Sequence, residues 1–187
     1  MHLSKAGYYA DFVVYPVLIL SLLGYQLVQI GAGAVRLATL VVVCLAGVCL
    51  WTLTEYVLHR YVLHHVPIVH DMHEAHHADP AALVGTPSWL SALLFMLTAF
   101  LPARWAFGLE AASALTAGMM LGYLCYVGVH HVTHHWRLVP GSWLYGLKHR
   151  HQRHHYAKTP GNFGVTTRFW DRVFGTSLDS GMRQGRS

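Results

Sequence analysis

The chain has 187 residues, of which 54% are hydrophobic and only 11% are Asp, Glu, Lys or Arg. A soluble domain carries roughly 25% charged residues, so this composition excludes an ordinary soluble domain and favours one domain embedded in a membrane, spanning residues 1–187. The net charge is +5, but we find no nucleic-acid-binding motif, so we expect no nucleic-acid partner and assign the basic residues to contact with anionic lipid headgroups.

Four stretches without charged residues or histidine predict transmembrane helices. They cover residues 12–35, 37–54, 82–103 and 111–129, close to the roughly 20 apolar residues that a membrane span needs. The first stretch lacks a small-residue cleavage signal, so we interpret it as a retained span and not as a signal peptide. The predicted fold is all-α. The rival interpretation, a large soluble helical bundle, would require a polar outer face that these stretches do not supply.

The connections between the stretches predict two helical hairpins. Gly31 and Gly33 predict a tight turn in the first hairpin. Gly85 and Pro87 interrupt the third stretch, so its helix is expected to begin near Ser88. The second hairpin is closed by a short link, which carries Pro102, Arg104 and Glu110. The three cysteines lie in apolar runs without CxxC spacing, and we expect them to be core residues, namely Cys44, Cys49 and Cys125.

Fifteen of the sixteen histidines fall in two groups, within residues 58–77 and 130–155. Two predicted spans separate the groups, so both groups emerge on the same membrane face and can form one helical cap, residues 55–80 and 130–176. Nine Lys or Arg residues against two Asp follow His135, which by the positive-inside rule makes this face cytoplasmic. The expected location is a bacterial inner membrane, or the endoplasmic reticulum in a eukaryote.

Ten histidines have the spacing of metal ligands. Each half of the chain carries an HxxHH motif, whose positions share one helical face, so we expect all three of its imidazoles to point to a common site. His59 and His64 are five residues apart and diverge by roughly 140° on an ideal helix. They serve different metals, or the helix loosens there. The predicted ligands are His59, His64, His73, His76, His77, His130, His134, His151, His154 and His155.

Ten imidazoles exceed what one metal ion can use, because a tetrahedral ion takes four ligands and an octahedral ion six. Two ions with about five nitrogens each would account for all ten. The remaining histidines are expected to be surface or supporting residues, although His131 and His135 could substitute for their neighbours; they are His2, His65, His70, His131, His135 and His149. Metal-bound histidines donate their second N–H to a carboxylate or carbonyl. Glu55 is the best-placed candidate carboxylate, ahead of Asp71, Glu74 and Asp171, and for all four a role in helix capping or on a solvated face stays equally open.

Five segments resemble the fatty acid hydroxylase superfamily, and within it most closely the fatty acid 2-hydroxylases. They cover most of residues 54–80 and 122–176 and read EYVLHRYVLHHVP, HEAHHADP, GYLCYVGVHHVTHH, GSWLYGLKHRHQRHH and NFGVTTRFWDRVFGT. The resemblance implies two iron ions, molecular oxygen as co-substrate, a lipid acyl substrate, and the ten histidines above as ligands. Some members carry a fused cytochrome b5 domain, which we do not expect here. The box HEAHH lacks a glycine common after the first histidine, a change that leaves the ligands intact.

The sequence therefore predicts a non-haem di-iron hydroxylase that oxidises a fatty acid or fatty-acyl lipid, at carbon 2. Zinc could replace iron in isolated protein, because imidazole sites accept both metals. Electrons are expected from a separate cytochrome b5-, ferredoxin- or flavoprotein-type donor that docks around Lys148, Arg150 and Arg153. Four aromatic residues are candidates for the wall of the substrate's access path, although aromatic residues at a membrane interface ordinarily serve as anchors; they are Tyr145, Phe163, Phe169 and Trp170.

Two other functions stay open at this point. The residues His73-Glu74-Ala75-His76-His77 also satisfy HExxH, the zinc metalloprotease motif in which Glu is the general base. An intramembrane protease would leave the other histidine motifs unexplained. A non-catalytic metal-binding or metal-transport protein is the third possibility, although transporter sites lie near the bilayer midplane and these histidines lie at helix ends.

Overall fold

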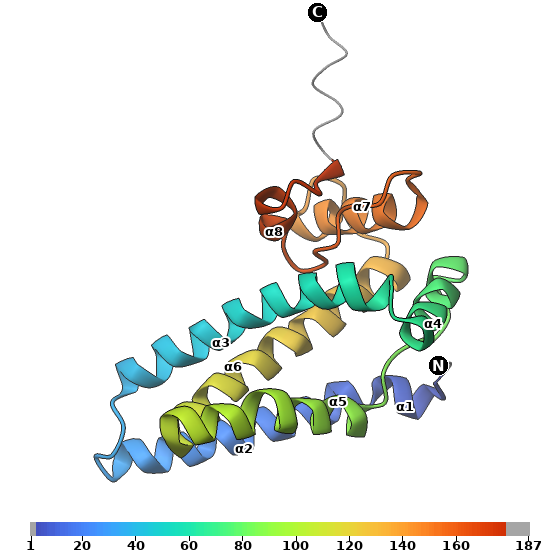
Figure 1. Cartoon of the computed structure of the whole chain (residues 1–187). Coiled ribbons are helices and arrows are strands. Elements are labelled where there is room, and N and C mark those ends of the chain that lie inside the picture. The colour runs from blue at the N-terminus through green and yellow to red at the C-terminus, as the bar shows by residue number, and fades with distance from the viewer. Residues whose placement is uncertain (1–2, 179–187) are drawn as a thin grey trace, which may run out of the picture. The chain divides into compact units, whose positions relative to one another are not determined.

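The computed structural model describes residues 3–178, which form helices and connecting loops and contain no β-strand (Figure 1). The described chain makes two compact units. Residues 3–51 and Leu83–Cys125 belong to the first, and Thr52–Ala82 and residues 126–178 belong to the second. Helices α3 (Leu37–Val57) and α6 (Leu101–His135) contribute residues to both units. The all-α prediction is confirmed.

Three helical runs are long and apolar enough to cross a membrane, namely Lys5–Gly31, Leu37–Leu63 and Ser88–His135. In the most apolar window of each run only 17% of the residues are buried. Many apolar side chains of these runs are exposed, among them Val17, Leu20 and Val42, and their exposure to water would be unfavourable whereas a bilayer could cover them. The first run joins the short α1 (Lys5–Tyr9) to α2 (Asp11–Gly31).

The third run contains both the third and the fourth predicted stretch. It comprises α5 (Ser88–Phe95), the π-helix η2 (Met96–Phe100) and α6. Gly108, at φ 85° and ψ 174°, interrupts the helix, and Figure 1 shows the chain turning back after α5. Glycine adopts a positive φ without the steric cost that a side chain adds. The predicted link is therefore too long, because Pro102 and Arg104 are helical and the turn is centred on Gly108.

Two other boundaries follow the sequence signals. Helix α2 ends at Gly31, Gly33 has a φ of 74°, and α3 begins at Leu37. Helix α5 begins at Ser88, directly after Pro87, as predicted from the interruption of the third stretch.

The interior of the first unit combines a buried carboxylate with stacked aromatic rings. Asp11 accepts hydrogen bonds from the Ser88 hydroxyl (2.5 Å) and the Tyr123 hydroxyl (2.7 Å). The Tyr123 ring lies 4.5 Å from that of Tyr15 and 5.1 Å from that of Trp51, centroid to centroid. These contacts tie α2, α3, α5 and α6 together at one end.

Helices α3 and α6 approach closely in the first unit because glycines face each other there. A Cβ atom on Gly118 would overlap the Cys44 carbonyl, and one on Gly47 would overlap the Leu115 carbonyl. Small residues at such crossings let two backbones come into van der Waals contact, the main source of helix association inside a bilayer.

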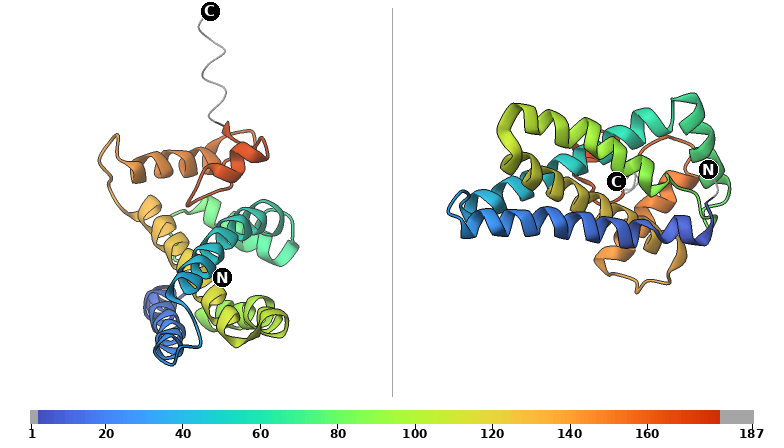
Figure 2. Two further views of the ribbon diagram at one scale, coloured as in Figure 1. Left: turned by 90° about the vertical axis from the view of Figure 1, so that its left-hand side faces the viewer. Right: turned by 90° about the horizontal axis from the view of Figure 1, so that it is seen from below.

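The second unit contains the end of α3, the π-helix η1 (Leu58–Leu63), α4 (Pro67–Ala78), the last residues of α6, α7 (Trp143–Tyr156) and α8 (Phe169–Val173). Pro67 opens α4, where its missing N–H costs nothing. Ser142 caps α7 by accepting a hydrogen bond from the Tyr145 amide at 3.2 Å. Figure 2 shows α8 beside α7, and the ion pair between Arg150 and Asp171 joins them.

Candidate metal centre

The ten predicted ligand histidines converge in the second unit as two groups of five. Within each group the ligating nitrogens all lie within 4.8 Å of one another. Cluster 1 consists of His59, His64, His73, His77 and His154. Cluster 2 consists of His76, His130, His134, His151 and His155. Two groups of five agree with the predicted number of ligands, about five nitrogens for each of two metal ions.

A π-helix brings His59 and His64 into the same cluster. On an α-helix these residues would diverge, but η1 spans Leu58–Leu63 with the wider i to i+5 repeat. Their imidazole rings stack with centroids 5.3 Å apart and an interplanar angle of 17°. Of the two alternatives that the spacing left open, the loosened helix is the one observed.

Each HxxHH motif divides its histidines between the clusters, so the expectation that all three point to one site is wrong. In α4, the Nε2 atoms of His73 and His77 lie 3.0 Å apart in cluster 1, whereas His76 Nε2 lies 3.0 Å from that of His130 in cluster 2. On a helix, residues four apart lie closer to the same face than residues three apart. His73 and His77 therefore point together, and His76 points to the other cluster. Helix α7 mirrors this division, since it contributes His154 to cluster 1 and His151 and His155 to cluster 2.

The short distances between the Nε2 atoms are explained better by ligation of a shared metal ion than by hydrogen bonds between the imidazoles. His73 Nε2 lies 3.1 Å from His59 Nε2, 3.2 Å from His64 Nε2 and 3.0 Å from His77 Nε2. One ring nitrogen carries either one hydrogen or one lone pair and cannot satisfy three such partners. Two nitrogens at right angles around an ion, with metal–nitrogen bonds of about 2.1 Å, would lie about 3.0 Å apart. The ten imidazoles therefore fit two metal ions that accept nitrogen ligands, iron among them.

Burial keeps these imidazoles neutral, as metal ligation requires. Burial, followed by the charge of His77, lowers the pKa of His64 and the pKa of His76 to about 4 each. Burial also lowers the pKa of His154 to about 3, against a hydrogen bond to the Gly161 carbonyl that raises it. Near neutral pH each of these rings offers a lone pair and not a positive charge.

Backbone carbonyls, not carboxylates, orient the ligands of cluster 1. His59 Nδ1 lies 2.5 Å from the Phe163 carbonyl, and His154 Nδ1 lies 2.9 Å from the Gly161 carbonyl. A carbonyl only accepts, so Nδ1 carries the hydrogen and Nε2 is left for a metal. The expectation that Glu55 would accept from a ligand histidine is wrong, because its carboxylate binds Val165 and Thr166.

The other three candidate carboxylates also have other partners. Asp71 and Glu74 lie 3.4 Å and 3.9 Å from ring nitrogens of His70, with side chains 84% and 54% exposed. Asp171 is fully buried and binds Arg150, not a histidine. Sequence reasoning missed the two carbonyls, because a backbone atom has no residue-type signature. The only sequence signal near them was the NFGVT segment, which contains Phe163, directly follows Gly161 and resembles the family.

The leftover histidines join neither cluster in the described chain. His131 and His135 stack on each other with ring centroids 4.5 Å apart and do not replace their neighbours. His65, His70 and His149 also lie outside both clusters. His2 lies outside the described residues.

The four predicted access-path aromatics have different environments. Phe163 is buried and packs edge-on against His59, His64 and His154, with centroids 5.5–5.9 Å apart, so it walls cluster 1. Trp170 donates its indole N–H to the Thr52 hydroxyl at 3.0 Å. Tyr145 and Phe169 are exposed on the surface of the second unit.

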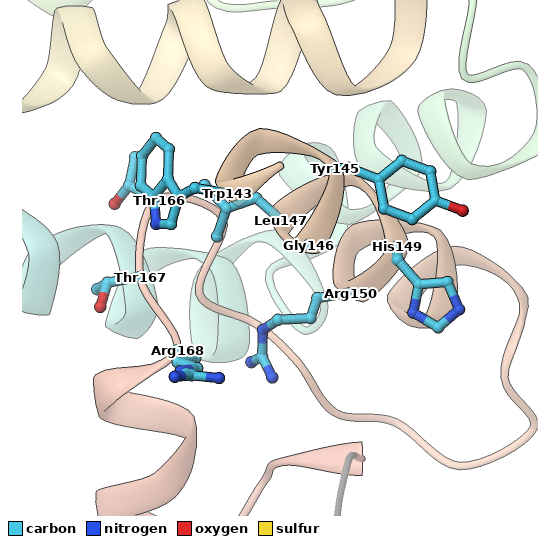
Figure 3. Close-up of a pocket in the computed structure, with 9 residues that line it drawn as sticks. All are labelled: Trp143, Tyr145, Gly146, Leu147, His149, Arg150, Thr166, Thr167 and Arg168. Atoms are coloured by element: carbon cyan, nitrogen blue, oxygen red, sulfur yellow. The ribbon is translucent and has the colours of Figure 1, made fainter. Parts of the chain in front are cut away.

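An open pocket of about 730 Å³ lies between α7 and the segment 166–168 (Figure 3). Its walls combine aromatic, hydroxyl and basic side chains, from Trp143, Tyr145, Gly146, Leu147, His149, Arg150, Thr166, Thr167 and Arg168. None of the cluster histidines lines it, so this pocket is distinct from the metal centre.

One of the three residues of the predicted basic docking patch is buried. Arg150 is only 7% exposed and donates to the Asp171 carboxylate at 3.2 Å. Lys148 donates to the Trp136 carbonyl at 2.7 Å, and Arg153 donates to the Leu178 carbonyl. The prediction is wrong for Arg150, because a buried cation requires a partner and this one has a carboxylate.

Comparison with known proteins decides the family. The profile of the fatty acid hydroxylase family matches residues 44–176, which include both clusters. The chain belongs to the fatty acid hydroxylase family. The predicted resemblance is therefore confirmed.

Relatives in the family include lipid hydroxylases from yeast and mammals. The chain is 40% identical to the ceramide very long chain fatty acid hydroxylase SCS7 of Saccharomyces cerevisiae over 114 residues, which are 57% of this chain and 28% of that protein. It is 34% identical to the fatty acid 2-hydroxylase of Rattus norvegicus over 110 residues, 57% of this chain and 29% of that one. The chain thus spans less than a third of these two relatives.

A solved structure shares the fold. It is described as full length scs7p with only the hydroxylase domain visible, and it superposes with a TM-score of 0.79 at 28% identity. The match covers 94% of this chain and 68% of that one.

Proposed function

We propose that this member of the fatty acid hydroxylase family is a di-iron, oxygen-dependent hydroxylase that acts at carbon 2 of a fatty acid or fatty-acyl lipid. One atom of molecular oxygen enters a C–H bond and the other leaves as water, which consumes two electrons and two protons. The observation that carries the proposal is the pair of five-imidazole clusters, each compact enough to surround one ion. The yeast and rat relatives named as hydroxylases support the same reaction type.

The chain's own residues have three tasks in this reaction. The ten histidines would hold the ions, and iron when bound would supply the oxygen chemistry that no side chain offers. Phe163 walls cluster 1 with an apolar ring and excludes water from it. The Phe163 and Gly161 carbonyls fix the orientation of His59 and His154, so the ligands are set before metal arrives.

The expected carbon follows from where the histidines lie along the helices. Counted from Thr54, where the charge-free stretch 37–54 ends, a helix that rises about 1.5 Å per residue would carry His59 and His64 roughly 8–15 Å further along its axis. The ions would then lie at headgroup level. Drawing methylenes out of the bilayer costs about 0.8 kcal/mol each, so reaching eight carbons down the chain would cost about 6 kcal/mol. Carbon 2, next to the carboxyl or amide carbon, is the least costly target.

The proposed topology has four membrane crossings within one membrane domain. The turns at Gly33 and Gly108 would divide the three apolar runs into two hairpins, with the histidine-bearing ends together. The excess of basic residues after His135 assigns these ends to the cytoplasmic side. There the two electrons would come from a separate donor of the cytochrome b5, ferredoxin or flavoprotein type.

No observation favours the protease or the transport alternative. A metalloprotease needs the Glu of HExxH beside its metal, whereas the Glu74 side chain is 54% exposed and lies against His70. A protease would leave most of the ten clustered histidines without a role, and a transport site would be expected near the bilayer midplane, whereas these histidines lie at helix ends.

The test compares two histidines of α7. His154→Ala removes a cluster 1 ligand, whereas His149→Ala removes an exposed histidine outside both clusters. Anaerobically prepared protein should contain two ions per chain, with zinc possible in place of iron. His154→Ala should lose at least one ion and abolish formation of 2-hydroxy lipids in expressing cells, and His149→Ala should retain both ions.

Fragmentation mass spectrometry of the lipids locates the hydroxyl. A single ion per chain that survives His154→Ala would exclude the two-metal proposal. A His154-dependent hydroxyl in mid-chain or at the methyl end would refute the depth argument and leave the hydroxylase standing.

A further inference from the structure

The segment Gly161–Thr166, here named the clamped loop, is fixed from one side by Glu55. Oε1 of this carboxylate accepts from the Val165 amide (2.6 Å) and the Thr166 amide (2.9 Å), and Oε2 accepts from the Thr166 hydroxyl (2.6 Å). Glu55 is 3% exposed. Three hydrogen bonds from one buried carboxylate hold the end of the loop to α3.

A second buried carboxylate fixes the loop from the other side. Asp171 accepts from the Phe163 amide at 2.8 Å and from the Gly164 amide at 2.9 Å. Asn162, with φ 56° and no exposed surface, donates its amide to the Thr176 carbonyl at 2.9 Å. A Cβ on Gly164 would overlap the Thr167 carbonyl. Every residue from Asn162 to Thr166 is therefore held by at least one hydrogen bond, and the loop has little freedom to shift.

The clamped loop supports cluster 1. Its Phe163 carbonyl receives His59 Nδ1 and its Gly161 carbonyl receives His154 Nδ1. Two of the five imidazoles of cluster 1 are thus oriented by the protein backbone, each with the hydrogen on Nδ1 and Nε2 left for the cluster.

Cluster 2 lacks equivalent support among the described residues. The Nδ1 atoms of His151 and His155 are buried and have no hydrogen-bond partner there. Ligation through Nε2 requires the hydrogen to sit on Nδ1, where it would be a buried donor without an acceptor. The two five-histidine clusters have the same ligand chemistry but unequal support.

We propose that the two metal positions differ in metal affinity and release rate. Cluster 1 binds its ion first and releases it slowly, and cluster 2 binds an ion that exchanges readily. Glu55 is a positioning residue for cluster 1, because it acts on His59 and His154 only through the clamped loop. This inference rests on the proposed two-metal function. Loss of a partner that orients a ligand histidine typically lowers metal affinity 10–100-fold, which sets the size of the expected difference.

The test follows the release of zinc from the purified full chain. Zinc-loaded protein in detergent micelles is mixed with a colorimetric chelator, and the ions released per chain are recorded over time. Two ions should leave in two phases that differ in rate at least tenfold. His64→Ala should remove the slow phase and His134→Ala the fast phase, since neither residue contacts the clamped loop through a hydrogen bond.

Glu55→Ala should then accelerate the slow phase 10–100-fold and leave the fast phase unchanged. Glu55→Gln keeps an oxygen for the two amides and should restore slow release. Asp11→Ala is the matched control, because it removes another buried carboxylate with two hydrogen bonds in the first unit. It should lower thermal stability and change neither rate.

The outcomes separate this inference from the proposed function. Fewer than two ions bound by the unaltered chain would refute the two-metal function and this inference with it. Two ions released at one rate would refute only the inference. A slow phase that disappears in His134→Ala, or a Glu55→Ala variant that accelerates both phases equally, would also overturn it.

Discussion

Removal of the Asp171 carboxylate should be among the most destabilising single changes in the second unit. Asp171 is fully buried, and its ion-pair partner Arg150 is only 7% exposed. Removing one member of a buried ion pair costs about 3–5 kcal/mol, because the other charge stays in the interior. The Phe163 and Gly164 amides lose their acceptor in the same step, so the upper end of this range applies to Asp171→Ala.

The expected loss can be read as a shift of the unfolding temperature. In a chain of this size 1 kcal/mol corresponds to roughly 2–4 °C, so a loss of about 5 kcal/mol in Asp171→Ala should lower the midpoint by roughly 10–20 °C. The assay is tryptophan fluorescence of the metal-free protein in detergent during heating. Asp71→Ala is the control, since that side chain is 84% exposed and should shift the midpoint by less than about 2 °C. A shift of Asp171→Ala as small as that of the control would refute the reasoning.

Two further predictions concern helix packing and electron supply. Gly118→Ala should lower the unfolding midpoint by several degrees, because its Cβ would meet the Cys44 backbone and overpacking costs about 1–3 kcal/mol. Gly24→Ala is the control and should not lower the midpoint, since no atom lies near its Cβ. Equal shifts of the two variants would contradict the packing argument. Purified chain with NADPH alone should not sustain hydroxylation, and turnover with an added donor should fall between 0.1 M and 1 M salt as the Debye length shrinks from about 10 Å to about 3 Å. Sustained turnover without a donor, or turnover indifferent to salt, would count against a separate protein that docks on exposed cations such as Arg172.

The periodic parts of the molecule were accessible from sequence, because helix geometry fixes which residues share a face. Charge-free length predicted α2 and α3, and Pro87 predicted the start of α5 at Ser88. His130 and His134 are four residues apart on α6 and therefore share a face, and their Nε2 atoms lie 3.2 Å apart. The spacing of His59 and His64 did not decide whether they belong to the same cluster, because nothing local in the sequence specified the π-helix η1.

Contacts between distant parts of the chain were not accessible in the same way. Glu55 and Thr166 are separated by 111 positions, and no spacing rule connects a carboxylate to an amide that far away. Arg150 read as a surface cation in a basic tail, yet tertiary packing buries it against Asp171. Ligand residue types carried a signal in the sequence, whereas the backbone atoms that orient them did not.

The exchange of histidines between the clusters has a consequence for biosynthesis. Cluster 1 takes four ligands from the first half of the chain but needs His154 from α7, and cluster 2 takes four from the second half but needs His76 from α4. A nascent chain that ends before α7 can complete neither set of five. Full metal capture must therefore wait until the last long helix has been made and folded back, so loading of the metals reports that both halves of the chain have come together.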